Sequence, residues 1–377
     1  MENKKQLGQF FTTNSIHILA GMETYIKEKN VTDPFAGDGD LLLWAKKLGA
    51  KSVKGFEIDK KFINGNNVFF NDSLLCPKKY EFVLTNPPYL NVNKADKATK
   101  EKYFKNGCED LYQMSLTAIM DSEEGIVIVP INFLSAENSE KVRGKFFSKF
   151  EIVKMNYFKN QVFSDTTYNV IVFYYKKKKK KKNIYKDSFK IKTRIYPDKR
   201  NIFIKLVKKH GWLIGGGYIN RIKSQKNELK IYRLQEKDLT NGEYGLRAAY
   251  NHIKERKVFF VSEEKRKLIK DNIILLKAID SGSEKGKIAL EDIRNYGLEG
   301  LVSKLTSRHM VQLIFGKQIT INEQKKIIEL FNEELKKQRK EHNSLFLTNY
   351  RDKDRKRISF KFTYKLINYL YANKLRV

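Results

Sequence analysis

Three short apolar runs in the first eighty residues each lead to an acidic residue, and this pattern limits what the chain can fold into. The runs end at Asp33, Glu57 and Asp72, and a predicted helix at residues 41–48 separates the first run from the second. Strands that alternate with helices form parallel sheets, in which the carboxyl ends of the strands meet at one edge. The three carboxylates are therefore expected together at that edge, where open α/β sheets bind their ligands.

The turn after the first strand reads Asp33-Pro34-Phe35-Ala36-Gly37-Asp38-Gly39. Glycines let the backbone approach a ligand closely, and Asp33 is placed to pair with an ammonium group. Glu57 has the spacing of an acceptor for ribose hydroxyls, and Asp72 is placed to accept from the amino group of a purine. Any one of them alone reads equally well as a surface acid. Together they predict a cradle for a nucleoside that carries a cationic amino acid, which is the shape of S-adenosylmethionine.

A second feature, Thr85-Asn86-Pro87-Pro88-Tyr89, follows the apolar strand at residues 81–84. Each proline fixes its own φ and restricts the residue before it, so the motif forms a rigid set of acceptors. A planar amino group laid against it donates one hydrogen to the Asn86 side chain and one to the Pro87 carbonyl, and Tyr89 stacks on the attached ring. This arrangement positions a weak nitrogen nucleophile. The alternative reading is a proline-rich turn after a strand.

In this order, the Asp-Pro-Phe-Ala-Gly-Asp-Gly, Phe-Glu-Ile-Asp, Asn-Asp-Ser and Asn-Pro-Pro-Tyr segments resemble the motifs of DNA adenine-N6 methyltransferases of the γ arrangement, across roughly residues 6–176. The resemblance implies an α/β fold, namely a Rossmann-like methyltransferase domain with a seven-stranded mixed sheet, and S-adenosylmethionine as cofactor. The implied catalytic residues are Asn86, Pro87, Pro88, Tyr89 and Phe163. The implied cofactor-binding residues are Phe11, Thr12, Asp33, Pro34, Ala36, Gly37, Gly39, Glu57, Ile58, Asp72, Ser73 and Asn86.

An adenine inside a duplex hides its amino group, so the resemblance also implies that the base is flipped out of the helix. In the family a phenylalanine at the position of Phe163 lies on the opposite side of the flipped base from the tyrosine, here Tyr89. Two aromatic rings replace the stacking that the base loses on leaving the duplex. Without the resemblance, Phe163 reads as a core aromatic before a strand.

The charge balance points to a polyanionic partner. The chain has 75 Lys and Arg against 43 Asp and Glu, a formal net charge of +32. Many basic residues provide salt-sensitive affinity for phosphates, although a basic surface that is merely solvated has the same composition. No apolar run reaches the length of a membrane helix, the first residues lack the apolar core of a signal peptide, and the two cysteines have no metal-ligand spacing. We expect a cytoplasmic protein without a metal and without a membrane partner.

A run of lysines at residues 176–182 marks a domain edge, because like charges resist packing. The expected domains are residues 1–180, which bind the cofactor and catalyse, and residues 181–377, a basic α+β target-recognition domain. In the second domain we expect a helix at residues 202–210, a capped helix from Thr320 and a last helix at residues 360–372. The predicted DNA contacts, partly in a basic loop at residues 349–357, are Lys94, Arg351, Lys353, Arg355, Lys356 and Arg357.

The sequence therefore predicts a site-specific DNA methyltransferase that modifies N6 of adenine in double-stranded DNA, as the modification enzyme of a restriction–modification system with a cognate restriction endonuclease. Two alternatives stay open. One methylates adenine in RNA or the amide of a protein glutamine with the same set of acceptors. The other is a nucleic-acid-binding protein that keeps the fold without turnover.

Overall fold

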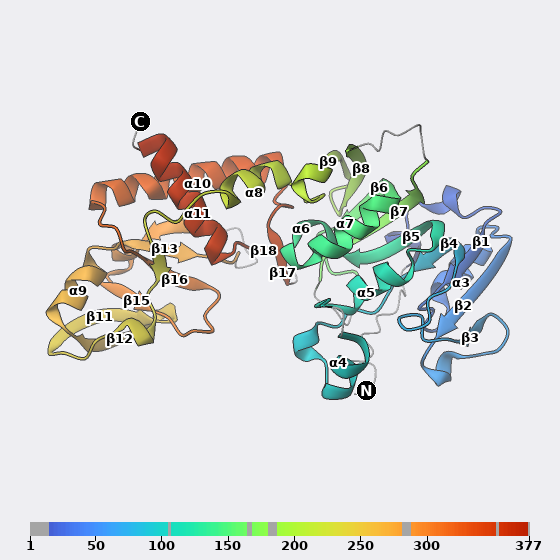
Figure 1. Cartoon of the computed structure of the whole chain (residues 1–377), viewed down its shortest axis with the longest axis horizontal. Helices are drawn as coiled ribbons and strands as arrows, with labels where there is room; N and C mark the ends of the chain where they lie inside the picture. Colours follow the sequence, from blue (N-terminus) through green and yellow to red (C-terminus); the bar gives the residue numbers. More distant parts are fainter. Residues whose placement is uncertain are drawn as a thin grey trace. The chain divides into compact units, whose positions relative to one another are not determined.

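The computed structural model describes residues 15–104, 107–163, 168–179, 187–280, 288–351 and 354–375. The chain divides into two compact units, both of which are drawn in Figure 1. Unit 1 comprises Met1–Gly216 with Arg351–Asp354, and unit 2 comprises Gly217–Tyr350 with Arg355–Val377.

Unit 1 is built on a nine-stranded mixed sheet with the order β3-β2-β1-β4-β5-β7-β6-β8-β9. Neighbouring strands from β3 to β5 are parallel, whereas β7 is antiparallel to both β5 and β6. The strands are β1 (Asn30–Asp33), β2 (Ser52–Glu57), β3 (Val68–Phe70), β4 (Tyr80–Thr85), β5 (Ser122–Pro130), β6 (Phe150–Phe158), β7 (Val170–Lys177), β8 (Ser188–Tyr196) and β9 (Arg200–Val207). The first seven strands form the mixed sheet that the sequence predicts.

The central strands of this sheet are buried along most of their length. Residues 82–84 of β4, 126–129 of β5 and 170–173 of β7 are all fully buried and apolar, as expected for strands covered on both faces. The helices of unit 1 are α2 (Ser15–Ile18), α3 (Asp40–Lys47), α4 (Lys97–Tyr103), α5 (Leu111–Ala118), α6 (Asn132–Ser135) and α7 (Glu140–Lys149).

Two predictions about the region after the lysine run need correction. The chain returns to the sheet after β7, because β8 pairs in parallel with β6 and then forms a hairpin with β9. The boundary expected between residues 180 and 181 therefore falls inside unit 1, and the sheet has nine strands rather than seven. The helix expected at residues 202–210 is instead β9 and a short 3-10 turn. Side-chain burial alternates along β9 as expected for a strand, since Ile204 and Leu206 are buried whereas Phe203 is 71% exposed.

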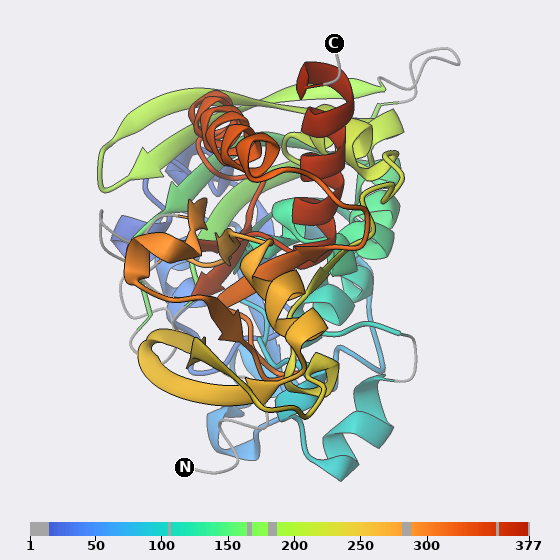
Figure 2. The same cartoon turned by 90° about the vertical axis from the view of Figure 1, so that its left-hand side faces the viewer.

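Unit 2 is an α+β unit with two main sheets, of order β10-β16-β13-β14 and β12-β11-β15. Its strands are β10 (Ile231–Arg233), β11 (Tyr244–Tyr250), β12 (His252–Val261), β13 (Ile274–Lys277), β14 (Ala289–Asp292), β15 (Gly300–Val302), β16 (Met310–Phe315), β17 (Thr348–Arg351) and β18 (Arg355–Arg357). Its helices are α8 (Gly216–Lys223), α9 (Glu263–Lys270), α10 (Ile321–Glu341) and α11 (Phe360–Leu370). Figure 2 shows β11 and β12 as a curved hairpin.

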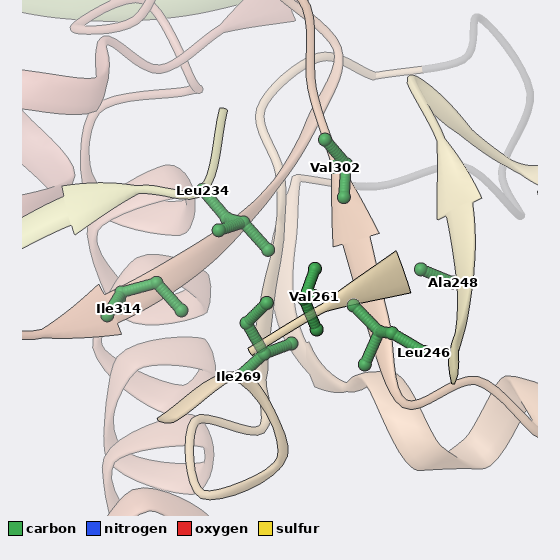
Figure 3. Close-up of a cluster of buried hydrophobic side chains, with 7 residues drawn as sticks. All are labelled: Leu234, Leu246, Ala248, Val261, Ile269, Val302 and Ile314. Carbon is green, nitrogen blue, oxygen red and sulfur yellow. The ribbon is translucent and has the colours of Figure 1, made fainter. Parts of the chain in front are cut away.

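One apolar cluster joins elements of the two sheets in unit 2 (Figure 3). It consists of Leu234, Leu246, Ala248, Val261, Ile269, Val302 and Ile314. The long helix α10 begins with the predicted capping box, in which the Thr320 hydroxyl accepts from the Glu323 amide and the Glu323 carboxylate accepts from the Thr320 amide. Within the described ranges, no helix is long and apolar enough to cross a membrane.

Candidate active site

The turn after β1 takes its shape from glycine. Gly37 and Gly39 have φ angles of 54° and 88°, in the left-handed region that side chains disfavour. Gly55 on the neighbouring strand is needed for close packing, since a Cβ there would lie 2.7 Å from the Cβ of Ala36. The turn thus lies directly on β2, and α3 starts at the residue after Gly39.

A cavity lies at the carboxyl ends of the first strands, with about 780 Å³ of empty space including the part open to solvent. Nine residues predicted to bind the cofactor line it: Asp33, Pro34, Ala36, Gly37, Glu57, Ile58, Asp72, Ser73 and Asn86. Gly39 shapes the turn instead, and Phe11 and Thr12 lie outside the described residues. The sequence pattern therefore brings together most of the set that it predicts.

Asp33 is the most deeply buried acid of the cavity, at 1% exposure. Its Oδ1 accepts from the Thr85 hydroxyl at 2.6 Å and from the Phe35 amide at 2.9 Å. Burial raises the pKa of its carboxyl to about 7, although these two hydrogen bonds act in the opposite direction. A buried carboxyl of this kind gains its charge readily only when a cation lies beside it.

Glu57 holds the turn and the end of β2 together. Its Oε2 accepts from the Gly37 amide at 2.9 Å, and its Oε1 accepts from the Ile58 and Asp59 amides at 2.8 Å each. Three backbone donors fix the carboxylate in one orientation on the cavity wall. The Glu57 carboxylate is therefore already held in position for the predicted contact with ribose hydroxyls.

Asn86 and Pro88 line the same cavity as these acids, next to the end of β4. The Tyr89 hydroxyl lies 2.6 Å from Asn86 Oδ1 and 2.7 Å from the Ile128 carbonyl oxygen. One hydroxyl carries one proton, so it donates to only one of these two acceptors at a time. The Asn86 oxygen that was predicted to receive a substrate amino group is therefore close to a competing donor in this structure.

The two aromatic rings predicted to stack on the flipped base, Tyr89 and Phe163, are buried in this structure. Tyr89 and Phe163 are each 4% exposed, Pro87 is buried, and none of the three lines the cavity. The ring of Tyr89 meets Tyr112 edge-on, with 6.4 Å between the ring centroids. Apolar rings pack against the protein when no base is present, so stacking on a base requires both rings to become accessible.

Further residues that were not among the predicted site residues also line the cavity. Among the described residues, Asp38 and Asp40 bring the number of carboxylates on the cavity wall to five, and burial together with Asp38 raises the pKa of Asp40. Tyr103 of α4 and Leu111 at the start of α5 also line it. Leu111 belongs to an Asp-Leu-Tyr segment that could signal a pocket, whereas Tyr103 lies in a lysine-rich stretch with no motif.

The predicted DNA-contacting residues of the C-terminal half are placed less favourably. Lys356 is only 1% exposed, because alternate residues of β18 point inward, and this corrects its prediction as a phosphate contact. Arg355 is half-buried and donates through Nε to the Asp280 carbonyl at 2.9 Å. Arg357 forms an isolated bridge with Ile279. The Arg351 side chain and Lys353 lie outside the described residues, and Lys94 is exposed.

Among the residues that the structure describes, no group of three or more His, Cys, Asp or Glu side chains is arranged to hold a metal ion. The five acids of the cavity are instead spread around its wall. In a chain with a net charge of +32, such a collection of carboxylates fits an organic ligand that carries positive charge.

Comparison with known proteins agrees with the motifs. Residues 11–163, less than half of the chain, match the family model described as Eco57I restriction-modification methylase. The type II methyltransferase M.HincII of Haemophilus influenzae is 28% identical over 188 residues, which cover 45% of this chain and 38% of that protein. M.HindII from a strain of the same species is also 28% identical over 188 residues, covering 45% of this chain and 36% of that protein.

The chain thus spans less than two fifths of the length of these two relatives. Among solved structures, the type IIG restriction endonuclease BpuSI superposes with a TM-score of 0.42 at 10% identity, over 91% of this chain and 56% of that chain. The resemblance to restriction–modification methyltransferases that the motifs predict is confirmed for residues 11–163 by the family match.

Proposed function

We propose that this chain is a site-specific DNA methyltransferase that transfers the methyl group of S-adenosylmethionine to N6 of an adenine flipped out of double-stranded DNA. The observation that carries the proposal is the shared cavity, because Asn86 lines the same space as Asp33 and Glu57. The family match supports it and suggests a role as the modification enzyme beside a restriction endonuclease.

The cavity fits the proposed cofactor on the properties of its own residues. Asp33 is buried and its pKa is raised to about 7, so a ligand ammonium group would restore the charge that burial disfavours. Glu57 is held by backbone donors with its carboxylate fixed on the wall. Asp72 lies further along the same edge, after β3. The order of the three acids matches the amino acid, ribose and purine of one extended ligand.

S-adenosylmethionine supplies, when bound, a methyl group on a positively charged sulfur. The Asn86 side-chain oxygen would accept one hydrogen of the adenine amino group. The Pro87 carbonyl would accept the other once this buried end of the site has opened, and the two acceptors would aim the nitrogen lone pair at the methyl carbon. Transfer would form the bond from nitrogen to carbon and break the bond from carbon to sulfur, so that the cofactor would leave as a neutral thioether. The nitrogen then loses one proton to solvent, so charge and atoms balance.

The direct test incubates the purified chain with tritiated S-adenosylmethionine and, in separate reactions, duplex DNA, RNA and protein. Nucleosides from the labelled DNA are then identified by mass spectrometry. N6-methyladenine in DNA is the expected product. Label in RNA or on protein glutamine would favour the alternative substrates, and cofactor binding without transfer would favour a non-catalytic nucleic-acid-binding protein.

Tyr89→Phe should reduce kcat/KM on DNA by less than about tenfold, because a single hydroxyl with two alternative acceptors contributes about 1 kcal/mol. The substrate amino group displaces this hydroxyl from Asn86, and the Ile128 carbonyl remains as its acceptor. Tyr89→Ala should cost roughly 5- to 150-fold, since it removes the stacking ring. Steady-state kinetics with circular dichroism as the folding control distinguish the two. Equal losses in both variants would show that the hydroxyl, not the ring, is needed.

The β11–β12 hairpin offers a better surface for DNA than the β17–β18 segment does. Arg256, Val258 and Phe260 alternate along β12, and Val258 and Phe260 are 52% and 65% exposed. Arg247 of β11 is the cross-strand partner of Val258 and is also exposed. On the opposite side of the hairpin, Val261 packs into the apolar cluster of Figure 3. Residues 248–250 of β11 also pair with β15, so the hairpin is a two-stranded ribbon only beyond this pairing. Basic and apolar side chains on the outer side of such a ribbon suit a DNA groove.

Neutralising this outer side should weaken DNA binding. We expect Arg247→Ala with Arg256→Ala to lower affinity for duplex DNA and to reduce the slope of log affinity against log salt by about 1 for each phosphate that the variant no longer neutralises. Fluorescence anisotropy across a salt series measures both quantities. Arg294→Ala is the matched control, because Arg294 is paired with Asp292 at 2.6 Å elsewhere in unit 2. An unchanged slope in the double variant would place the DNA contacts on another surface.

A further inference from the structure

The end of α4 brings two side chains into contact with Asp72, which lines the cavity, and neither has a role in the function proposed above. The Tyr103 hydroxyl donates to Asp72 Oδ2 at 2.9 Å, and Lys102 Nζ lies 2.9 Å from the same oxygen. Tyr103 itself lines the cavity and is 7% exposed. Because both contacts use Oδ2, a ligand amino group that reaches Asp72 would bond to its other oxygen, Oδ1.

The protonation states suit this arrangement. Burial raises the pKa of Tyr103 to about 12, so its hydroxyl stays protonated and can act as a donor. Burial alone would lower the pKa of the Lys102 ammonium, but its hydrogen bonds to Tyr103 and Asp72 raise it overall. The hydroxyl of Tyr103 and the ammonium of Lys102 therefore both act as donors to Asp72 Oδ2.

The segment that carries α4 is held in place by backbone contacts at its two ends and by apolar packing on its inner side. An antiparallel bridge joins Asn91 to Asp110, and the Val92 amide donates to the Glu109 carbonyl at 2.8 Å. Inside, Tyr103 packs with Leu90, Ala95 and Leu111 in one apolar cluster. Since Leu90 directly follows Tyr89, the same cluster connects the wall of the cavity to the end of the Asn-Pro-Pro-Tyr segment.

We propose that Tyr103 and Lys102 are positioning residues for the purine of the cofactor. They fix the carboxylate of Asp72 through one oxygen so that the other oxygen accepts from the purine amino group, and the Tyr103 ring closes that end of the cavity. The inference rests on the proposed function for the identity of the ligand. It adds that recognition of the purine depends on residues of α4 as well as on the acid at the end of β3.

The test compares two ligands that differ at the purine amino group. Binding of S-adenosylhomocysteine and S-inosylhomocysteine, which has a keto oxygen in place of that group, is measured by isothermal titration calorimetry. Tyr103→Phe should weaken S-adenosylhomocysteine about tenfold, because a buried donor then no longer holds the charged Asp72 in place. Lys102→Met should weaken it by about two- to fivefold, because the Lys102 side chain is 44% exposed and an exposed ion pair contributes less. Both variants should change binding of S-inosylhomocysteine by less than about twofold, because this ligand offers Asp72 no amino hydrogen.

Lys100→Met is the matched control, since Lys100 lies on the same helix and is exposed; it should bind both ligands as the wild type does. Equal losses for the two ligands in Tyr103→Phe and Lys102→Met would show a merely structural role and overturn the inference, as would no loss for either ligand. If the wild-type chain bound neither ligand, the proposed function itself would fail together with the inference. That outcome is distinct, because it appears before any substitution is made.

Discussion

Asn86→Ala is expected to lower the rate of methyl transfer on the order of 10³-fold, the largest effect of any single substitution in this chain. Asn86 supplies one of the two acceptors that orient the adenine nitrogen, and removing one preorganised polar group from such a site costs about 10²–10³ in rate. Misorientation of the nitrogen adds to this loss. Single-turnover labelling of duplex DNA measures the rate without a contribution from product release.

The structure also indicates that this variant will fold. When Asn86 Oδ1 is removed, the buried Tyr89 hydroxyl still has the Ile128 carbonyl as an acceptor at 2.7 Å, so no donor is left unsatisfied there. Affinity for S-adenosylhomocysteine should fall much less than the rate, because Asp33, Glu57 and Asp72 remain. Asn93→Ala, at an exposed asparagine beyond the motif, is the control. A rate in Asn86→Ala above one tenth of that of the wild type would contradict the assignment.

Local sequence patterns were sufficient to predict three of the cavity's acids, because these three lie at or just after the end of a strand. Asp33 and Glu57 close β1 and β2, and Asp72 comes two residues after β3, so the parallel order of these strands brings them to one edge. The signal for Tyr103 is absent from the sequence for a physical reason. Its contact with Asp72 spans 31 positions and depends on how the segment after the catalytic motif packs, which no local pattern specifies.

The region after the lysine run shows where a charge pattern misleads. Lys176 and Lys177 do not end the unit: they are the last residues of β7, an interior strand of the sheet, where they pair with Glu151 at 3.6 Å and Glu123 at 2.6 Å. The chain then adds β8 and β9 to that sheet. In the sequence, residues 202–207 read Ile-Phe-Ile-Lys-Leu-Val and show no clear period, because Phe203 is apolar although it is exposed. The period of two that marks a strand is visible only in the burial of Ile204 and Leu206. The lysine run therefore does not mark a domain boundary, because the strands that follow it pair with the same sheet.

The burial of the Tyr89 and Phe163 rings could not be predicted from the sequence either. The motif predicts which rings meet a base, but not what they do without one. Tyr89 and Phe163 are both 4% exposed, since an unoccupied apolar surface is better packed against protein than left in water. The proposed reaction therefore includes an opening step at this end of the site, for which the unfavourable exposure of the rings is offset by stacking on the base.

Asp33→Asn should have opposite effects on stability and on cofactor affinity. The folded pKa of Asp33 is about 7, against an ordinary value of 3.8, so the folded protein binds more protons than the unfolded chain between these pH values. Stability of the wild type is therefore lost as pH rises through this window and levels off above pH 7, where the cost of the buried charge is roughly 3–5 kcal/mol. Asparagine keeps an Oδ1 acceptor for Thr85 and Phe35 and carries no charge. Above pH 7 the variant without ligand should be the more stable protein, with an unfolding temperature several degrees higher.

Affinity for the cofactor should change in the other direction. An ammonium group binds the ionised form of Asp33, so affinity of the wild type for S-adenosylhomocysteine should increase up to about tenfold per pH unit below pH 7 and become constant above it. The Asp33→Asn variant should bind S-adenosylhomocysteine on the order of 100-fold more weakly than the wild type at pH 8. Its affinity should show no such pH dependence, because asparagine offers the ammonium group no ionisable carboxyl. Asp121→Asn, at an exposed carboxylate that does not line the cavity, should leave the unfolding temperature and the pH profile unchanged. Calorimetric titrations and thermal unfolding of the three proteins from pH 5 to pH 9 check both signs at once. A variant Asp33→Asn that is less stable than the wild type at pH 8, or that binds the ligand equally well, would show that Asp33 is a structural acid rather than the partner of the ammonium group.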